Sequence, residues 1–195
     1  MGREFELKYT ATPESFAILK TRYPQLAPIR METAYYDNDA GDFSRLRWTF
    51  RRRLENGKSI CTLKTPAAGL GRNEWETECD DILVSVEKLI ALGAPRQLVA
   101  LTVSGVKQTC GARFTRLAGL LTLANTEVEL ALDEGILLGA GRTMPLMEVE
   151  VELKSGSEDA AVAFGGELAR ELGLTIQPKS KIARARTLAE QTHKE

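Results

Sequence analysis

The sequence predicts a mainly β domain of the α+β class: an eight-stranded antiparallel closed β-barrel, or tunnel, with a charged interior and flanking helices. Three observations predict this fold. Charged residues recur at every second position in separate stretches, the residues between them are mostly apolar, and roughly eight such strands are interrupted by segments of helical periodicity. Eight antiparallel strands suffice to close a barrel. If the charged faces all point inward, the barrel encloses a wet channel, and helices cover its apolar outer face.

The alternating charges are the strongest of these observations. A strand sends successive side chains to opposite faces, so a period of two places each charged set on one face. An ordinary antiparallel sheet with one wet face is the alternative. However, these faces are almost entirely Glu, Arg and Lys, which are poor strand formers, and this composition indicates a ligand that needs both signs of charge. The charged sets are Glu4, Glu6 and Lys8; Arg45, Arg47, Arg51 and Arg53; Arg72, Glu74, Glu76 and Glu78; and Glu148, Glu150, Glu152 and Lys154.

The N-terminal half is expected to form a meander. Residues 3–10 predict a strand, and Thr12-Pro13-Glu14 predicts the start of a capped helix that ends near Tyr23. A turn is expected at residues 38–42, a type I′ hairpin at Asn56-Gly57 and a flexible link at residues 66–71. The further strands predicted here are residues 33–37, 44–54, 58–65 and 72–79.

The C-terminal half alternates helices with longer strands. Apolar groups at helical spacing predict a helix over residues 82–92, followed by a short helix near residues 95–103. Ser157 is expected to cap a helix that ends at Gly173, and residues 181–194 predict a terminal helix. The strands predicted in this half are residues 107–117, 120–125, 127–132 and 146–154.

Length and charge limit the class of protein. A chain of 195 residues, 43% hydrophobic, predicts one domain over residues 1–195. With 26 basic and 27 acidic residues, the formal charge of -1 gives no bulk attraction to nucleic acid or to an anionic membrane, so we expect neither as a partner. No stretch approaches the roughly 20 apolar residues of a membrane span, and the N-terminus lacks the apolar region of a signal peptide. We therefore expect a cytoplasmic protein.

The cysteines and the histidine exclude several chemistries. The three cysteines, Cys61, Cys79 and Cys110, lack a C-x-x-C spacing, which argues against a disulfide framework or a zinc site. Cys61 and Cys79 alternate out of phase with the charges and are expected to be buried. The single histidine, His193, lies close to the C-terminus, which argues against a His-based triad. Catalysis must then use carboxylates, amines, guanidiniums or a metal.

Taken in order along the chain, the motifs resemble those of the CYTH superfamily, the triphosphate tunnel metalloenzymes. The resemblance covers essentially the whole length and is closest to the bacterial inorganic triphosphatase type. The matching segments are Glu4-Phe5-Glu6-Leu7-Lys8, Phe50-Arg51-Arg52-Arg53, Asn56-Gly57, Thr62-Leu63-Lys64, Arg72-Asn73-Glu74-Trp75-Glu76, Phe114-Thr115-Arg116, the strand Glu129 to Gly135, Glu148 to Gly156, and Lys179-Ser180-Lys181 with Arg184.

The resemblance implies a tunnel that binds a linear triphosphate together with Mg²⁺ or Mn²⁺. Arg forks and Lys ammoniums suit phosphate oxygens, and hard divalent cations take carboxylate ligands. For any one basic residue, a structural salt bridge across the barrel is the alternative. The expected triphosphate-binding residues are Lys8, Arg51, Arg53, Lys64, Arg72, Arg116, Lys179 and Lys181, and the expected metal ligands are Glu4, Glu6, Glu74, Glu148, Glu150 and Glu152.

The implied reaction is metal-assisted attack of water on a terminal phosphorus. Some members of the family carry a lysine two residues before the mid-chain arginine, where this chain has Phe114. The general base therefore stays open, and the catalytic candidates are Lys8, Lys64 and Glu76.

The leading function is hydrolysis of inorganic triphosphate to pyrophosphate and phosphate. Class IV adenylate cyclase and thiamine triphosphatase are alternatives within the same fold. A non-catalytic binder of polyphosphate or nucleotides, and an ordinary β domain with structural ion pairs, are alternatives of other classes. The physiological triphosphate, the preference for Mg²⁺ or Mn²⁺, and the oligomeric state, with a homodimer as one candidate, stay open.

Overall fold

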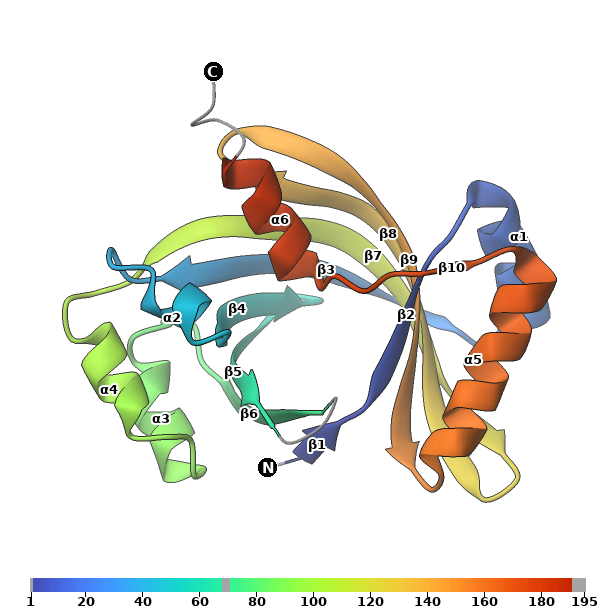
Figure 1. The fold of residues 1–195 in the computed structure, drawn as a ribbon, viewed down its shortest axis with the longest axis horizontal. Helices are drawn as coiled ribbons and strands as arrows, with labels where there is room; N and C mark the ends of the chain where they lie inside the picture. Colours follow the sequence, from blue (N-terminus) through green and yellow to red (C-terminus); the bar gives the residue numbers. More distant parts are fainter. Residues whose placement is uncertain (1, 68–70, 191–195) are drawn as a thin grey trace.

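A computed structural model describes residues 2–67 and 71–190, with side chains from residue 5 onward. One antiparallel sheet dominates, and Figure 1 shows it curving around a concave side. In chain order the strands are β1 (Gly2–Glu4), β2 (Glu6–Thr10), β3 (Ala27–Asp37), β4 (Thr49–Glu55), β5 (Lys58–Pro66), β6 (Arg72–Glu78), β7 (Lys107–Leu123), β8 (Thr126–Gly139), β9 (Arg142–Ser155) and β10 (Thr175–Ile176). The helices are α1 (Pro13–Arg22), α2 (Asp42–Arg45), α3 (Ser85–Ala91), α4 (Gln97–Thr102), α5 (Glu158–Leu172) and α6 (Lys181–Glu190).

The mainly β, antiparallel architecture is confirmed, but the closed eight-stranded barrel is wrong. In the described part of the chain the sheet has ten strands, in the open order β1-β6-β5-β4-β3-β7-β8-β9-β2-β10. The strand predicted over residues 3–10 has two different partners, because residues 2–4 pair with β6 and residues 6–10 pair with β9. Only Phe5 separates these two strands. The N-terminal segment therefore contributes β1 at one end of the strand order and β2 next to the other end. The short β10 then adds to the free edge of β2.

The capping residues expected from the sequence form their caps. The Thr12 hydroxyl accepts a hydrogen bond from the Ser15 amide at 3.3 Å and starts α1. The Ser157 hydroxyl accepts one from the Ala160 amide at 3.3 Å, and Gly173 ends α5 with a φ of 65°. The hairpin between β4 and β5 also forms as predicted, because Asn56 and Gly57 take φ values of 49° and 89°.

The charged row predicted along residues 45–53 begins later than expected. Asp37 accepts hydrogen bonds from the Phe43 amide at 3.0 Å and from the Ser44 amide at 3.1 Å, which stabilises the short helix α2. Arg45 therefore lies at the end of α2, and Arg47 follows it in a turn with a φ of 58°. Both are exposed and outside the strand, so the alternation holds here only from Arg51 onward.

Several strands are longer than the sequence predicts. The strands expected at residues 107–117 and 120–125 form the single strand β7, because the ladder to β8 continues from Cys110–Gly139 to Leu123–Thr126 without a break. The hydrogen bonds of that ladder offset the low strand propensity of Gly119. β3 likewise starts at Ala27, ahead of the predicted Thr33, since its first residues pair with β7.

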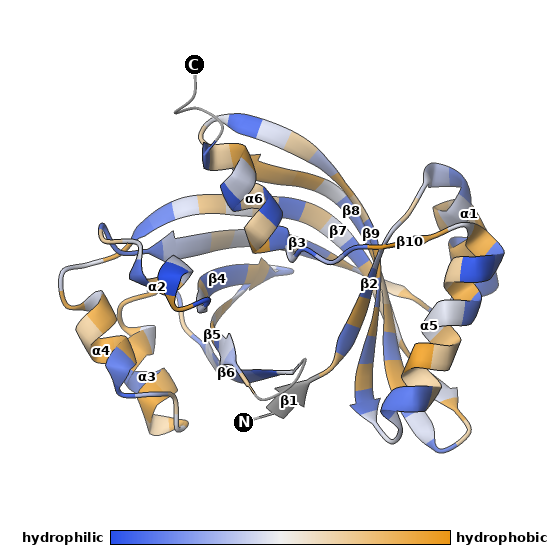
Figure 2. Ribbon diagram, viewed as in Figure 1, coloured by the Kyte–Doolittle hydropathy of each residue, from blue (hydrophilic) through white to orange (hydrophobic). Residues whose placement is uncertain are grey.

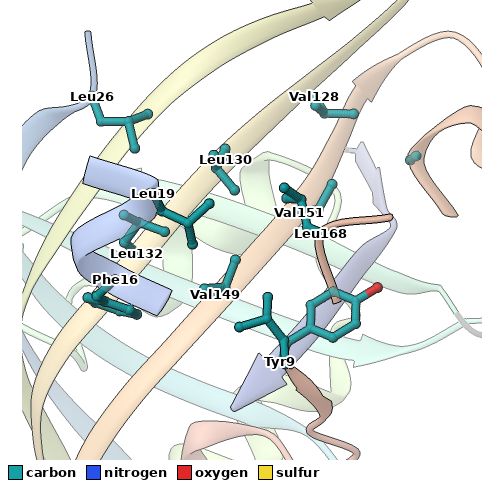
Figure 3. Close-up of a cluster of buried hydrophobic side chains, with 12 residues drawn as sticks. Tyr9, Phe16, Leu19, Leu26, Val128, Leu130, Leu132, Val149, Val151 and Leu168 are labelled. Carbon is teal, nitrogen blue, oxygen red and sulfur yellow. The ribbon is translucent and has the colours of Figure 1, made fainter. Parts of the chain in front are cut away.

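The apolar faces of the strands pack under helices, as the alternation predicts. Figure 3 shows one core between α1 and strands β2, β8 and β9, in which Phe16, Leu19, Leu132 and Val149 lie together. A second core places Phe50, Leu63 and Trp75 against α2, α3 and α4. Hydrophilic and hydrophobic residues alternate along β2, β8 and β9 in Figure 2. Cys61 and Cys79 are buried free thiols, as predicted, and Cys110 is buried as well.

The terminal helix α6 corrects the expectation that helices cover only the outer face. Figure 1 shows α6 on the concave side, and Ile182 and Ala185 pack with Leu137 and Leu146 in a third core. The approach is close, because a Cβ on Gly139 would lie 2.5 Å from the carbonyl oxygen of Ala185. α6 is described to Glu190, and the rest of the helix predicted to residue 194 lies outside the described residues. Among the described helices, none has the length and apolar character needed to cross a membrane.

Candidate functional site

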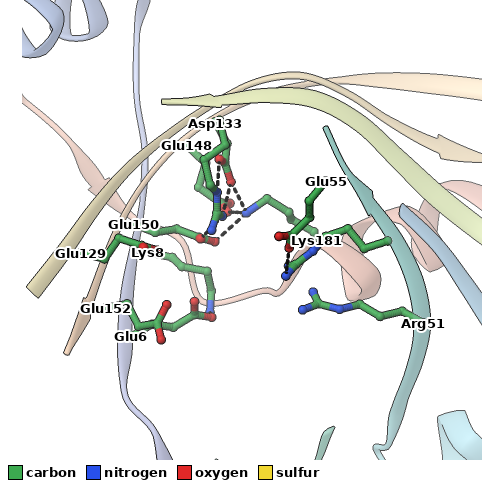
Figure 4. A network of polar contacts seen from close by, with 12 residues as sticks. Glu6, Lys8, Arg51, Glu55, Glu129, Asp133, Glu148, Glu150, Glu152 and Lys181 are labelled. Carbon is green, nitrogen blue, oxygen red and sulfur yellow. Dashed lines mark hydrogen bonds and ion pairs between the residues drawn. The ribbon is translucent and has the colours of Figure 1, made fainter. Parts of the chain in front are cut away.

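The concave side of the sheet holds a cavity of about 530 Å³ whose walls are mostly charged. Its lining comes from β2 to β9 and from the first turn of α6, so the charged faces do point inward. Figure 4 shows part of this network, with side chains from opposite walls directed toward one another. The basic residues of the lining are Lys8, Arg51, Arg53, Lys64, Arg72, Arg116, Lys154 and Lys181, and the acidic ones are Glu6, Glu55, Glu74, Glu76, Glu78, Glu129, Glu150 and Glu152.

One wall, formed by β4, β5 and β6, concentrates the arginines and is called the basic wall. The Lys64 ammonium lies 3.1 Å from a Glu74 oxygen, and the Arg51 guanidinium lies 3.7 Å from the same carboxylate. Arg53 forms an ion pair with Glu55 and lies 3.9 Å from Glu76. The basic side chains of this wall are thus paired with carboxylates, and a guanidinium can pair with a phosphate oxygen in the same way.

The electrostatics of the basic wall centre on Arg53 and Glu76. Burial and then the neighbouring positive charge of Arg51 lower the pKa of Arg53. Its buried Nε has no hydrogen-bond partner among the described residues. Burial opposes ionisation of Glu76, but Arg51 and Arg53 outweigh it and lower its pKa, and the Thr62 hydroxyl donates a hydrogen bond to it at 2.8 Å. The wall therefore offers buried positive charge, and Glu76 beside it is ionised.

The opposite wall, formed by β2, β8 and β9, presents carboxylates and is called the acidic wall. Glu6 and Glu129 each lie opposite Glu152 on the neighbouring strand, so three carboxylates share one face. Lys8 lies 2.8 Å from Glu6, and Lys154 lies 2.8 Å from Glu152. Burial opposes the charge of Lys8, but Glu6 and more distant glutamates outweigh it, so the pKa of Lys8 is raised and its ammonium stays protonated.

Deeper between the same strands lies a fully ion-paired group, called the buried cluster, of Asp133, Glu148 and Glu150. Their ligand oxygens lie within 4.8 Å of one another, and all three side chains are buried. Lys181 from α6 lies 2.8 Å from Asp133 and 2.6 Å from Glu150, and it also pairs with Glu148. Arg116 pairs with Asp133 and Glu150, and Arg184 pairs with Glu148.

The two glutamates of the buried cluster have pKa values shifted in opposite directions. Burial raises the pKa of Glu148 to about 7. The positive charge of Lys181 lowers this pKa, but the negative charge of Glu150 adds to the effect of burial. Burial also favours the neutral form of Glu150, but the positive charges of Lys181 and Arg116 outweigh this effect and hold the pKa of Glu150 well below its usual range. At neutral pH Glu150 is therefore ionised, whereas Glu148 is only partly ionised.

The donor set fits a hard divalent cation. All the acidic groups facing the cavity offer carboxylate oxygens, the ligands that Mg²⁺ and Mn²⁺ prefer, and Glu6, Glu129 and Glu152 come from three adjacent strands. The carboxylates of the buried cluster also lie close together, but they are already paired with Lys181, Arg116 and Arg184. A metal dependence is therefore consistent with the residues present.

The structure brings most of the predicted site residues together in this cavity. Lys179 is an exception, because it is exposed and does not contribute to the lining. Glu148 belongs to the buried cluster and does not line the cavity, but it forms an ion pair with Lys181, which does. Glu4 lies in β1, and its side chain lies outside the described part of the structure. The predicted residues that line the cavity are Glu6, Lys8, Arg51, Arg53, Lys64, Arg72, Glu74, Glu76, Arg116, Glu150, Glu152 and Lys181.

Six charged residues of the site were not among the predicted ligands, and two of them, Glu55 and Glu78, line the cavity from β4 and β6. Glu129 and Asp133 lie on one face of β8 in the same phase, and Lys154 continues the acidic row of β9. Arg184 follows Lys181 on α6 and pairs with Glu148. The alternation along residues 129–133 carried a signal for Glu129 and Asp133, but the apolar Ala131 between them weakened it.

Phe114 occupies a position beside the buried cluster. Its ring centroid lies 5.5 Å from the Lys181 ammonium and 5.9 Å from the Arg116 guanidinium. Both cations therefore face an aromatic surface on one side and carboxylates on the other. The sequence has a phenylalanine, and therefore no ammonium, at this position of β7. In the structure the ammonium of Lys181, which belongs to α6, lies in the same region.

Comparison with known proteins gives a match to the CYTH domain over residues 2–185. Three solved structures superpose over nearly the whole chain. A Hippeastrum adenylyl cyclase candidate with a dominant triphosphatase activity is 18% identical, with a TM-score of 0.67 over 95% of this chain and 96% of that one. An adenylate cyclase candidate from Bacillus halodurans is 17% identical, with a TM-score of 0.62 over 92% and 96%. A protein from Pyrococcus horikoshii is 25% identical, with a TM-score of 0.60 over 96% and 99%.

Proposed function

Because the chain belongs to the CYTH domain family, we propose that it is a metal-dependent triphosphatase that hydrolyses inorganic triphosphate to pyrophosphate and phosphate. The observation that carries the proposal is the cavity of about 530 Å³ in which a basic wall faces an acidic wall. A linear triphosphate carries several negative charges and needs cations along its whole length. A site with arginines on one side and metal-binding carboxylates on the other meets that need.

The basic wall binds and orients the phosphates. Arg51 and Arg53 supply guanidinium forks, and Lys64 and Arg72 extend the positive surface along β5 and β6. The buried Nε of Arg53 gives a phosphate oxygen a donor that no described residue uses. On the far side, Lys8 stays protonated and neutralises charge that develops on the phosphoryl oxygens.

Attack by water on the terminal phosphorus forms one P–O bond and breaks the bond to the bridging oxygen, which leaves as pyrophosphate. The proton of the water passes to a base. Among the three candidates, Lys8 is disfavoured because its amine is protonated. Glu76 is ionised, and its position beside Arg51 and Arg53 allows it to orient the water next to bound phosphate. We assign this orienting role to Glu76, with Lys64 stabilising the charge.

The residues that would hold Mg²⁺ or Mn²⁺ are Glu6, Glu129 and Glu152 of the acidic wall. When bound, such an ion neutralises phosphate charge and lowers the pKa of a water ligand. Lys8 and Lys154 offset only part of the negative charge of these three carboxylates, so a bound cation would reduce the repulsion between this wall and a triphosphate.

A specific observation favours a second candidate substrate, thiamine triphosphate. Ile29, Met31 and Ile60 contribute an uncharged strip to the cavity. Inorganic triphosphate makes no use of such a surface, whereas an organic group attached to a triphosphate buries against it. Glu55 and Glu78, which also line the cavity, suit an organic group with a positive charge.

A phosphate-release assay on the purified chain tests the proposal. Inorganic triphosphate, thiamine triphosphate and ATP are each incubated with Mg²⁺ and with Mn²⁺, with chelator added to a parallel set. We expect phosphate release from inorganic triphosphate at the highest kcat/KM, and none in the presence of the chelator. Chromatography of the ATP reaction for cyclic AMP tests the cyclase alternative.

The outcomes separate the competing functions. If inorganic triphosphate is untouched with either metal while thiamine triphosphate or ATP is consumed, the choice of substrate is wrong. Tight binding of triphosphate with no product under any condition identifies a binding protein. Absence of both binding and turnover would mean that the charged cavity is only structural.

A further inference from the structure

Lys181 is bound in the buried cluster as a metal ion would be. Its ammonium contacts one oxygen each from Asp133, Glu148 and Glu150, and these are the three residues whose oxygens lie close enough together to hold a cation. An ammonium has three hydrogens to donate. The ammonium donates hydrogen bonds to Glu148 and Glu150, and Asp133 completes its surroundings as an ion-pair partner at 2.8 Å.

The remaining oxygens of the cluster are also occupied by cations. Arg116 donates through Nε and Nη2 to the two oxygens of Asp133, both at 2.8 Å, and it pairs with the second oxygen of Glu150. Arg184 pairs with the second oxygen of Glu148. Both oxygens of every carboxylate thus have a basic partner, and three acidic side chains are matched by three basic ones.

We infer that Lys181 is a built-in cation that fills the buried cluster, so that Asp133, Glu148 and Glu150 do not bind the divalent metal in the native protein. The metal is left to the acidic wall. A divalent ion placed beside Lys181 would add two positive charges to a buried group in which three basic side chains already face the three acidic ones, and such an excess of positive charge is costly away from water.

The position of α6 makes this arrangement intrinsic to the fold. Lys181 begins α6, and Ile182 and Ala185 of the same helix are fixed in the third core. The ammonium is therefore delivered by a packed element and is not a mobile surface side chain. Phe114, whose ring centroid lies 5.5 Å from the ammonium, covers its remaining side.

Direct titration with Mn²⁺ tests the inference, with the electron paramagnetic resonance signal of free Mn²⁺ as the readout. The proteins compared are the full chain, Lys181→Met, Asp133→Asn and the double variant. We expect Lys181→Met to bind one more equivalent of Mn²⁺ than the wild type, and the double variant to lose that gain. Asp133→Asn alone should bind the same number as the wild type. Lys20→Met, which removes an exposed lysine paired with Glu134 at 3.3 Å, is the matched control and should change nothing.

Two results would overturn the inference. One is a lower number of bound Mn²⁺ in Asp133→Asn with Lys181 intact, because the cluster would then be a metal site in the native protein. The other is an unchanged number in folded Lys181→Met. If circular dichroism shows that Lys181→Met is unfolded, Asp133→Asn and Glu148→Gln decide the question, and Lys181→Arg, which keeps the charge, should bind the wild-type number.

The inference rests on the proposed function only for the premise that the protein takes a divalent metal. Its readout is bound Mn²⁺ and not phosphate release. A chain that binds Mn²⁺ but hydrolyses none of the triphosphates would refute the proposed function and still test the role of Lys181.

Discussion

Arg116 and Asp133 lie directly opposite each other on β7 and β8 and form a two-pronged pair, with Nε–Oδ1 and Nη2–Oδ2 distances of 2.8 Å each. Asp133 is fully buried, and the Arg116 side chain is 13% exposed. The pair thus lies within the sheet ladder itself and links two strands through both their backbones and their charges.

Removal of Arg116 should be strongly destabilising. Arg116→Ala leaves the carboxylate of Asp133 buried without its two-pronged partner, and breaking a buried pair in this way costs about 3–5 kcal/mol. Urea unfolding measures the loss. The matched control is Arg113→Ala on the same strand, whose pair with Glu32 is exposed on both sides and should cost about 0–1 kcal/mol. Equal losses in the two variants would mean that the buried pair contributes no special stability.

Arg53 and Arg52 are adjacent on β4 but should differ in their effect on turnover. Arg53 lines the cavity, whereas Arg52 donates to the carbonyl oxygen of Asp80 at 2.8 Å outside it. A hydrogen bond to a charged group contributes about 1.5–3 kcal/mol, so Arg53→Ala should lower kcat/KM for the triphosphate by roughly one to two orders of magnitude. Arg52→Ala should stay within about twofold of the wild type. A wild-type rate in Arg53→Ala moves the phosphate site elsewhere.

The buried thiol of Cys61 predicts a loss of stability at alkaline pH. Burial raises the pKa of Cys61 from 9.0 to about 11. The folded state therefore keeps a proton that the unfolded chain has released, and the free energy of unfolding falls as the pH rises from about 9 toward 11. Urea unfolding of the wild type and Cys61→Ala across this range isolates the effect, since the variant should show a shallower fall. Parallel pH profiles would contradict the prediction.

Gly139 should be intolerant of any side chain. A Cβ there would lie 2.5 Å from the Ala185 carbonyl oxygen and 2.7 Å from the Ala189 amide nitrogen. Gly139→Ala must push α6 away from β8, which costs about 1–3 kcal/mol, and hydrogen exchange in α6 should accelerate. Gly166→Ala on α5 is the control, because no atom lies within 4 Å of its added Cβ. That variant should gain up to about 1 kcal/mol from helix propensity. Equal stability of the two variants would show that α6 packs more loosely than the distances indicate.

The sequence was sufficient to place the charged faces because their signal is local. Glu148, Glu150 and Glu152 alternate with Val149 and Val151, and burial of the valines fixes the direction of the glutamates. The caps at Thr12 and Ser157 are local too, since each hydroxyl binds an amide three residues away. Features of this kind need no knowledge of distant partners.

The features that the sequence did not predict depend on long-range pairing. Residues 3–10 read as one strand, because nothing in them shows that Glu4 faces Arg72 while Glu6 faces Glu152. The length of β7 likewise depends on β8. The pattern of α6 predicts a helix, but the side of the sheet that it covers is decided by Gly139 and by the carboxylates that receive Lys181.

The division of the N-terminal segment between β6 and β9 has a consequence for biosynthesis. β2 finds its main partner only in β9, so residues 6–10 cannot complete their pairing during synthesis until the chain has been made as far as Ser155. Contacts of such high sequence separation slow folding. In the meantime the incomplete sheet turns a face of glutamates, lysines and arginines to the solvent, and this charge protects the nascent protein from aggregation while its last wall is missing.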